Sequence, residues 1–191
     1  DYQPSVLSAH LPPLAERIRP RRIDEFIGQK KITNCTSLII KSIQNKRPFS
    51  MILWGPPGTG KTTLARIIGI EFDVQLFELS AVSSGIAQVR QILKQGKNNF
   101  EAGRRSILFI DEIHRFNKTQ QDALLHAVEE GTIILIGATT ENPSFEIISP
   151  LLSRCRVLRL YALTGKELYI IINRAISKDI LLSQKSISFD G

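Results

Sequence analysis

The stretch that decides the fold is Met51-Ile-Leu-Trp-Gly-Pro-Pro-Gly-Thr-Gly-Lys-Thr-Thr63. It begins as an apolar run typical of a buried strand and stops at a glycine-rich loop. From Gly55 to Thr62 the loop fits G-x-x-x-x-G-K-[ST] without a departure, and an amphipathic helical pattern follows it. An ordinary glycine and proline turn is the alternative, but the strand, loop and helix in register favour a phosphate-binding loop.

The residue types of this loop suit a nucleoside triphosphate and its metal. Glycines allow backbone angles closed to other residues, so successive N–H groups can turn inward around an anion. Lys61 can reach the terminal phosphates, Thr62 offers a hydroxyl to Mg2+, and the helix that begins near Gly60 adds its positive dipole end. We therefore expect ATP and Mg2+ to be bound by Gly55, Pro56, Pro57, Gly58, Thr59, Gly60, Lys61, Thr62 and Thr63.

The composition is that of a globular protein. The chain has 191 residues, of which 42% are apolar, so it is long enough for one α/β domain with a core and part of a second domain. No apolar run approaches the roughly 20 residues of a membrane span, and no signal peptide is visible. Cys35 and Cys155 lack the paired spacing of a zinc site or a disulfide framework. These features predict a soluble, cytoplasmic protein with no membrane partner.

The charge balance leaves two interpretations open. Twenty-five basic and 18 acidic residues give a net charge of +7. Such a surplus permits an acidic polymer as partner, because Lys and Arg that neutralise phosphates supply nucleic-acid affinity. A solvated basic surface, together with the arginines that a phosphate site needs, explains the charge equally well.

The pattern of the core predicts a doubly wound α/β domain. Five short apolar runs alternate with helical patterns, at residues 51–54, 75–79, 106–110, 133–138 and 157–160. Nearly all-apolar strands that alternate with helices are typical of a five-stranded parallel sheet covered on both faces. In such a sheet, ligands lie at the carboxyl ends of the strands. Helices are expected near residues 37–45 and 118–130; for the second, Asn117 and Gln120 predict a capping box and Gly131 a stop.

Three parts follow from this pattern. Residues 1–32 are rich in proline and predict an extended arm on the core, and residues 33–162 form the α/β core. Residues 163–191 begin a second domain, with a helix that is capped by Thr164 and Glu167 and ends near residue 178. Because this part stops without a closing element, we expect the chain to be a fragment of a longer protein.

Two acids follow the strand expected at residues 106–110. Asp111 at this tip would hold the Mg2+ coordination shell, and Glu112 would polarise the water that attacks the γ-phosphorus. A plain solvated turn also places two acids after a strand. The glycine-rich loop upstream favours the catalytic interpretation.

Further polar residues follow the next two strands. Thr140 could hydrogen-bond the γ-phosphate or the attacking water, although a threonine that merely ends a strand is the better interpretation in isolation. Arg154 could act as an arginine finger on a neighbouring subunit's nucleotide, since its planar charged fork suits a transferred phosphoryl group. Arg156 and Arg159 are rivals, and a surface ion pair is the alternative. His114 either faces the phosphates or DNA, or is structural.

Together these motifs resemble the AAA+ ATPases of the clamp-loader and branch-migration group. Three longer runs are similar, more narrowly, to the replication-associated recombination protein A family, whose eukaryotic relative is the Werner helicase interacting protein. They are His114-Arg-Phe-Asn-Lys-Thr-Gln-Gln-Asp-Ala-Leu-Leu125, Val128-Glu-Glu-Gly-Thr132 and Ile136-Gly-Ala-Thr-Thr-Glu-Asn-Pro-Ser-Phe145. The similarity covers about residues 12–178.

The resemblance implies several properties. The strand ending at Thr140 would lie between the loop strand and the Asp111 strand, and Arg154 would act in trans. It also implies a DNA-dependent ATPase that forms a homotetramer at stalled replication forks, near the nucleoid, with single-strand-binding protein as a partner. The core would be followed by a helical lid, here truncated, and the adenine would be bordered by Arg19, Pro20, Ile27 and Gly28. A clamp-loader subunit, a Holliday-junction motor subunit and a non-hydrolysing nucleotide-gated scaffold are the alternatives.

Overall fold

A computed structural model describes residues 11–183 of the chain and divides them into two compact units. The larger unit comprises residues 21–163, and the smaller one combines residues 11–20 with residues 164–183. The predicted arm is therefore divided between the two units after Pro20.

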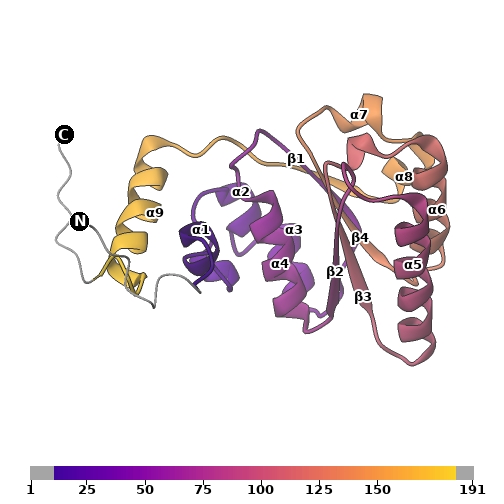
Figure 1. Cartoon of the computed structure of the whole chain (residues 1–191), viewed down its shortest axis with the longest axis horizontal. Helices are drawn as coiled ribbons and strands as arrows, with labels where there is room; N and C mark the ends of the chain where they lie inside the picture. The colour runs from indigo at the N-terminus through magenta and orange to yellow at the C-terminus, as the bar shows by residue number, and fades with distance from the viewer. Residues whose placement is uncertain (1–10, 184–191) are drawn as a thin grey trace. The chain divides into compact units, whose positions relative to one another are not determined.

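The larger unit is built on one parallel sheet of five strands (Figure 1). The strands are β1 (Met51–Trp54), β2 (Gln75–Ser80), β3 (Ser106–Asp111), β4 (Ile134–Thr139) and β5 (Arg156–Arg159). Their order across the sheet is β2-β3-β4-β1-β5. The five predicted strands are confirmed to within one residue at either end, and β4 lies between β1 and β3 as the family resemblance implies.

Both faces of the sheet are buried, because successive side chains of a strand point to opposite sides. Met51 and Leu53 of β1 join one apolar cluster, whereas Ile52 between them joins the other. In β3, Phe109 belongs to the first cluster and the neighbouring Leu108 to the second. This two-sided burial explains why the strands are continuous apolar runs rather than alternating ones.

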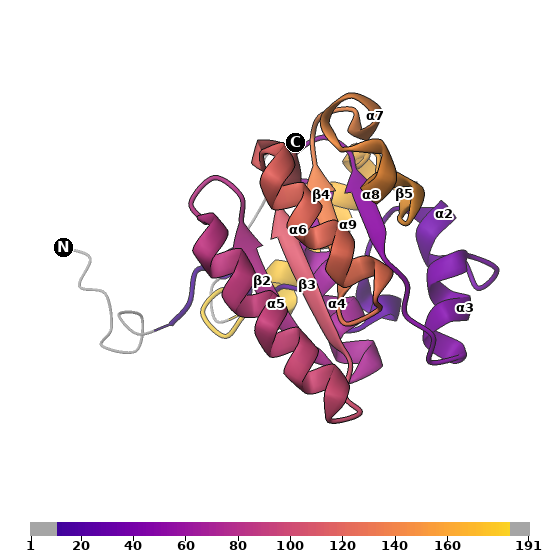
Figure 2. The ribbon, with the colours of Figure 1, turned by 90° about the vertical axis from the view of Figure 1, so that its right-hand side faces the viewer.

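Helices cover the two faces in separate layers (Figure 2). On one side lie α3 (Leu38–Gln44) and α4 (Lys61–Phe72), which add Ile39 and Ile67 to the first cluster. On the other side lie α5 (Ile86–Glu101), α6 (Lys118–Glu129) and α8 (Ser149–Ser153), which contribute to the second cluster. The shorter elements of this unit are η2 (Ile23–Glu25), α2 (Lys30–Thr33), η3 (Ile113–Arg115) and α7 (Pro143–Glu146).

The predicted helix punctuation of α6 is confirmed. The Asn117 side chain accepts a hydrogen bond from the Gln120 N–H at 2.9 Å, and the Gln120 side chain accepts one from the Asn117 N–H at 3.0 Å. Gly131 has a φ of +70°, the left-handed conformation that ends many helices. These bonds satisfy backbone donors that the first turn of a helix leaves unpaired.

The smaller unit holds α1 (Leu14–Arg17) and α9 (Gly165–Lys178). The capping box predicted for Thr164 and Glu167 is present at the start of α9. Asp179, just after α9, accepts hydrogen bonds from the Arg17 guanidinium at 2.6 Å and 2.9 Å. This pair ties the segment before the larger unit to the segment that follows it.

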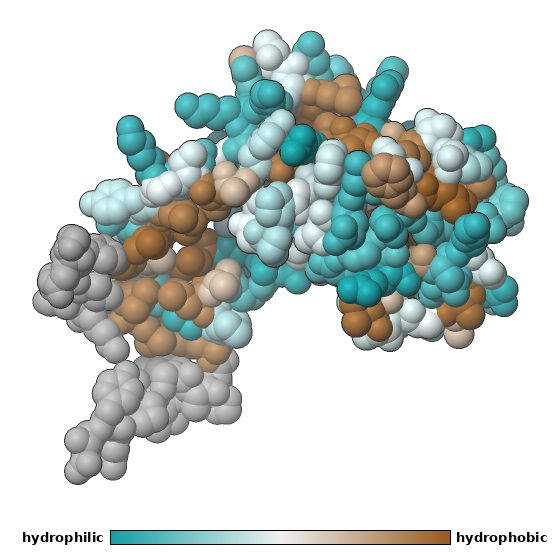
Figure 3. Space-filling model, turned by 90° about the horizontal axis from the view of Figure 1, so that it is seen from above, coloured by the Kyte–Doolittle hydropathy of each residue, from teal (hydrophilic) through white to brown (hydrophobic). Residues whose placement is uncertain are grey.

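Apolar side chains remain exposed on this smaller unit (Figure 3). Ile170 and Ile180 are more than half exposed, and Leu168 and Ile172 nearly so. The sequence pattern of α9 is therefore that of a helix with an apolar side that the described residues do not cover. Within residues 11–183, no helix is both long and apolar enough to cross a bilayer.

Candidate nucleotide site

The predicted nucleotide motifs meet at the carboxyl ends of three neighbouring strands. The glycine-rich loop follows β1, Asp111 is the last residue of β3, and Thr139 is the last residue of β4. The strands are parallel and β4 lies between the other two, so their tips share one end of the sheet. The Gly55 N–H donates to the Thr139 carbonyl at 3.1 Å and joins the loop directly to β4.

The loop needs glycine at specific positions. Gly58 and Gly60 have φ values of +74° and +93°, which L side chains rarely adopt. Gly55 has a different requirement: a methyl group there would lie 2.4 Å from the backbone oxygen of Leu160. At Gly60 a methyl group would lie 2.9 Å from the ring of Phe26. The loop is therefore held between the end of β5 and the segment around Phe26.

Lys61 is the buried cation of the site. Its ammonium donates to the carbonyls of Gly55 at 2.7 Å and Pro56 at 2.9 Å. Burial lowers its pKa, while the nearby carboxylates of Glu112 and Asp111 act in the opposite direction. The lysine and the two acids therefore lie within electrostatic reach of each other, as a shared triphosphate and metal require.

The two acids are presented by an unusual backbone turn. Glu112 has a φ of +54°, in the left-handed region, and its N–H donates to the Asp111 carboxylate at 3.1 Å. Left-handed residues other than glycine cluster at functional sites, where the surroundings hold them. The side chains of Asp111 and Glu112 remain accessible enough to meet a ligand, since both residues are half-buried.

His114 lies inside the site rather than on the surface. Its Nδ1 is 2.9 Å from the Thr139 hydroxyl and 3.3 Å from the Glu112 carboxylate, and the side chain is only 8% exposed. Thr139 is fully buried, and its hydroxyl also accepts the Glu141 N–H at 3.0 Å. Sequence reasoning singled out Thr140 and missed Thr139, because only the fold shows which threonine points inward.

The other threonines predicted for the site differ in burial. Thr140 is half-buried and comes directly after β4, and Thr62 and Thr63 are half-buried in the first turn of α4. Thr59 is buried, and its hydroxyl donates to the Pro56 carbonyl at 3.0 Å. Pro56, Pro57 and Gly58 are exposed at the tip of the loop.

Arg154 lies at the other end of the sheet. It ends α8 just before β5, whose first residue, Arg156, pairs with the first residue of β1. Its guanidinium forms an ion pair with Glu129 and donates to the Pro150 carbonyl at 2.9 Å. The surface ion pair considered from the sequence is therefore present, and Arg154 is separated from its own phosphate loop by the length of a strand.

The rival Arg159 is occupied by aromatic rings. Its guanidinium carbon lies 4.8 Å from the Trp54 ring centre and 5.3 Å from that of Tyr161. Both distances are within the range of a cation–π contact. Arg159 thus contacts two aromatic rings at the edge of the sheet, and Trp54 is half-buried.

Gln29, which sequence reasoning missed, anchors the segment before the core to the site. Its side-chain amide donates to the Tyr161 carbonyl at 2.6 Å and accepts from the Tyr161 N–H at 2.9 Å. The same amide lies 3.5 Å from the Thr59 carbonyl of the loop. The neighbouring Ile27 and Gly28, predicted to border the adenine, are thereby held beside the loop. The other two, Arg19 and Pro20, belong to the smaller unit.

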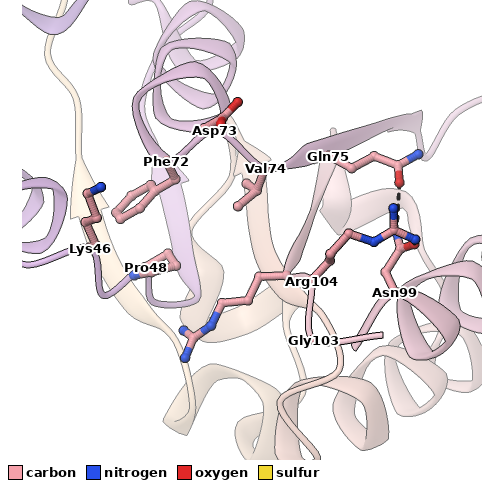
Figure 4. Close-up of a pocket in the computed structure, with 10 residues that line it drawn as sticks. Lys46, Pro48, Phe72, Asp73, Val74, Gln75, Asn99, Gly103 and Arg104 are labelled. Carbon is pink, nitrogen blue, oxygen red and sulfur yellow. Dashed lines mark hydrogen bonds between the residues drawn. The ribbon is translucent and has the colours of Figure 1, made fainter. Parts of the chain in front are cut away.

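A separate pocket lies at the amino ends of β2 and β3 (Figure 4). Its volume is about 470 Å³, and Gln75, Asn99 and Arg104 stand on one side of it. Its cations Lys46, Arg104 and Arg105 follow the ends of α3 and α5, where the helix dipole favours positive charge. Their position therefore has a local explanation, and this pocket is at the wrong end of the sheet for the nucleotide motifs.

The donor set at the carboxyl end fits Mg2+. Among residues 11–183, no group of three or more His, Cys, Asp or Glu side chains gathers as a metal cluster. Mg2+ in nucleotide sites needs few protein ligands, because phosphate oxygens and waters supply the others. One hydroxyl from Thr62 and one carboxylate from Asp111 are a set of this kind.

Comparisons with known proteins agree with this geometry. Residues 18–157 match the family model described as "Holliday junction DNA helicase RuvB P-loop domain". The solved structure of the Thermotoga maritima RuvB Holliday junction branch migration motor is similar, with a TM-score of 0.70 and 37% sequence identity over 84% of this chain and 54% of that one. The P-loop α/β fold predicted from the motifs is therefore confirmed.

Two curated relatives carry the names that the sequence motifs indicated. Replication-associated recombination protein A of Escherichia coli (strain K12) is 48% identical over 164 residues, which are 86% of this chain and 37% of that protein. ATPase WRNIP1 of Dictyostelium discoideum is 45% identical over 178 residues, 93% of this chain and 20% of that protein. The predicted resemblance is thus confirmed, and the chain spans well under half the length of either relative.

Proposed function

Because the chain belongs to the RuvB P-loop domain family, we propose that it hydrolyses ATP with Mg2+ and couples hydrolysis to replication and recombination on DNA. The single observation that supports this most strongly is the convergence of Lys61, Asp111 and Glu112 at one end of the sheet. A non-hydrolysing scaffold would need the lysine, but it has no evident use for a carboxylate in the position of Glu112.

Each residue of the site has one task in the proposed reaction. The loop amides and Lys61 hold the phosphates, and Lys61 can turn from its two carbonyl partners to the γ-phosphate. Thr62 and Asp111 would hold Mg2+, which when bound neutralises charge on the phosphate oxygens. Glu112 accepts a proton from the attacking water, and Thr140 orients that water or the γ-phosphate.

Arg154 is proposed to complete a neighbouring subunit's site. It is exposed at the end of the sheet opposite its own loop, which supports action in trans rather than in cis. Its pairing with the half-exposed Glu129 is a weak surface interaction that a phosphate could replace. This role requires a homo-oligomer, for which we propose the tetramer implied by the family resemblance.

The Glu112→Gln substitution tests the proposed hydrolysis. The amide keeps the shape of the carboxylate but cannot take a proton, so the variant should bind ATP and release phosphate at least about a hundredfold more slowly. Steady-state phosphate release with DNA present measures the rate, and a fluorescent ATP analogue measures binding. A rate near that of the unsubstituted protein would remove Glu112 from the mechanism.

A mixing experiment tests action in trans. Arg154→Ala should lower turnover without weakening ATP binding, because the finger is absent from its own subunit's site. Mixing this variant with Glu112→Gln should restore some activity, since mixed oligomers place an intact arginine beside an intact glutamate. Failure to restore activity at any ratio would exclude the trans arrangement.

We further propose a cytoplasmic, nucleoid-associated protein that acts on forks, DNA ends or single-strand to double-strand junctions, with single-strand-binding protein as a partner. The names of the relatives support a role in replication and recombination. Binding to forks, ends, single strands and four-way junctions at several salt concentrations tests this, because the slope against salt counts phosphate contacts. Preference for the four-way junction would favour the second candidate, a Holliday-junction motor subunit, which the RuvB similarity supports.

A further inference from the structure

His114 lies in the nucleotide site, but the proposed hydrolysis assigns it no role. It is buried, and a single ring nitrogen faces both the Glu112 carboxylate and the Thr139 hydroxyl, at 3.3 Å and 2.9 Å. Among residues 11–183, no other side chain forms a hydrogen bond or an ion pair within 4.0 Å with the Glu112 carboxylate. The imidazole is therefore the contact that can set the direction of that carboxylate.

The surrounding groups assign the hydrogen of this ring to Nδ1. A carboxylate accepts hydrogen bonds and cannot donate them, so a proton on the ring nitrogen 3.3 Å from Glu112 is the favourable arrangement. The one hydroxyl hydrogen of Thr139 has its own acceptor in the Glu141 carbonyl at 3.3 Å. Nδ1–H of His114 then points to the Thr139 hydroxyl at 2.9 Å, and the Glu112 carboxylate lies 3.3 Å from the same nitrogen.

The backbone at Glu112 has an unusual conformation. Its left-handed φ of +54° is unfavourable for a side chain larger than glycine, and persists only where neighbouring groups fix it. The carbonyl of Glu112 already accepts the Arg115 N–H at 2.8 Å, which fixes the turn itself. The carboxylate of the side chain has its one ion-pair contact within residues 11–183 with His114.

We propose that His114 is a positioning residue that aligns the Glu112 carboxylate to accept a proton from the attacking water and couples it to the phosphate loop. The coupling passes through Thr139, whose hydroxyl meets His114 and whose carbonyl accepts the Gly55 N–H at 3.1 Å. Displacement of the tip of β4 by a bound γ-phosphate therefore moves the Glu112 carboxylate as well. The inference rests on the proposed role of Glu112 as the activating base.

Two substitutions that differ only in where they place a donor test this. His114→Asn can put its amide N–H where Nδ1–H lies, whereas His114→Gln puts the amide one atom further out. A displacement of about 1 Å can cost about a hundredfold in rate, so we expect kcat to fall about 10- to 100-fold for the glutamine variant. The asparagine variant should stay within about threefold of the unsubstituted protein, and neither should change ATP affinity by more than about twofold.

Two controls separate positioning from structural damage. The exposed His126 of α6 is a matched site, and its asparagine and glutamine variants should leave kcat unchanged. In a Glu112→Gln background, His114→Gln should add less than about twofold to the loss, because residues that act as a unit are not additive. Equal kcat values for the two His114 variants, or full additivity, would overturn the proposal.

Nitrogen NMR of the His114 ring gives a readout that does not depend on activity. The Nδ1-protonated tautomer is expected, and an Nε2-protonated neutral ring would overturn the inference even in an active protein. If the unsubstituted protein releases no phosphate, the proposed function fails and the positioning role fails with it. If it hydrolyses ATP and loses activity with Glu112→Gln but not with His114→Gln, only the positioning role fails.

Discussion

Replacing Gln29 should weaken both the fold and the nucleotide site. Its amide makes two short hydrogen bonds to the backbone of Tyr161, at 2.6 Å and 2.9 Å, and Gln29 itself is buried. A typical intramolecular hydrogen bond contributes about 1 kcal/mol, so the loss of two predicts a cost of about 2 kcal/mol for Gln29→Ala. Unpaired backbone groups left at Tyr161 would increase that cost.

Urea unfolding measures this directly. The chain has one tryptophan, Trp54, at the end of β1 next to the loop, so its fluorescence reports on this region. Gln29→Ala should lower the unfolding midpoint while the slope against urea stays the same. Gln29→Glu should cost at least as much, because a carboxylate oxygen would then face the Tyr161 carbonyl. The exposed Gln91 of α5 is the matched control, with an expected change within about 0.5 kcal/mol.

Nucleotide binding should change together with stability. Gln29 lies 3.5 Å from the Thr59 carbonyl and holds the segment that includes Ile27 and Gly28 beside the loop. A weaker anchor should therefore lower the affinity for a fluorescent ATP analogue several-fold. If Gln29→Ala costs less than about 0.5 kcal/mol and binds the analogue normally, the hydrogen bonds to Tyr161 do not hold this segment, and the reasoning from the geometry is wrong.

Three further outcomes are expected. Gly55→Ala should lower ATP affinity at least about tenfold, because its methyl group would meet a backbone oxygen that cannot turn away; normal affinity would show that the loop tolerates the shift. The hydrogen bond from Arg17 holds the pKa of Asp179 well below its usual range, at about 2, so this carboxylate's contribution to stability should be complete above about pH 4 and lost as the pH falls towards 2. Arg17→Met should remove that part of the acid dependence, which an acid unfolding curve measures. Burial raises the pKa of the Cys155 thiol to about 12, so a thiol reagent at pH 8 should label only the exposed Cys35 in the native protein and both cysteines in denaturant; two reactive thiols in the native state would contradict this.

Local patterns predicted the elements of this fold well. A continuous apolar run is sufficient to indicate a strand that is buried on both faces, and the five strands lie where such runs occur. A capping box needs only two side chains three residues apart, so the start of α6 could be found from Asn117 and Gln120 alone. The loop from Gly55 to Thr62 was also predictable from a local pattern, because the residues that would bind phosphate are consecutive in the chain.

Contacts between distant parts of the chain were not predictable in this way. The sequence shows Thr139 and Thr140 side by side, and only the packing of β4 between β1 and β3 buries Thr139 against His114. Gln29 and Tyr161 are separated by 132 positions, and no local pattern marks their hydrogen bonds. The placement of Arg154 at the opposite end of the sheet likewise depends on the direction of β5.

The amino-acid sequence by itself therefore determined the type of domain, the phosphate loop and the two acids, because each depends on residues close together in the chain. The tertiary structure alone decided that the acids lie within electrostatic reach of Lys61, that the His114 ring lies 3.3 Å from the Glu112 carboxylate, and that Arg154 lies at the end of the sheet opposite its own loop. In a parallel sheet, the carboxyl ends of neighbouring strands lie together even when the strands are far apart in the chain. Which strands are neighbours is decided by the packing of the core and not by any local stretch of sequence.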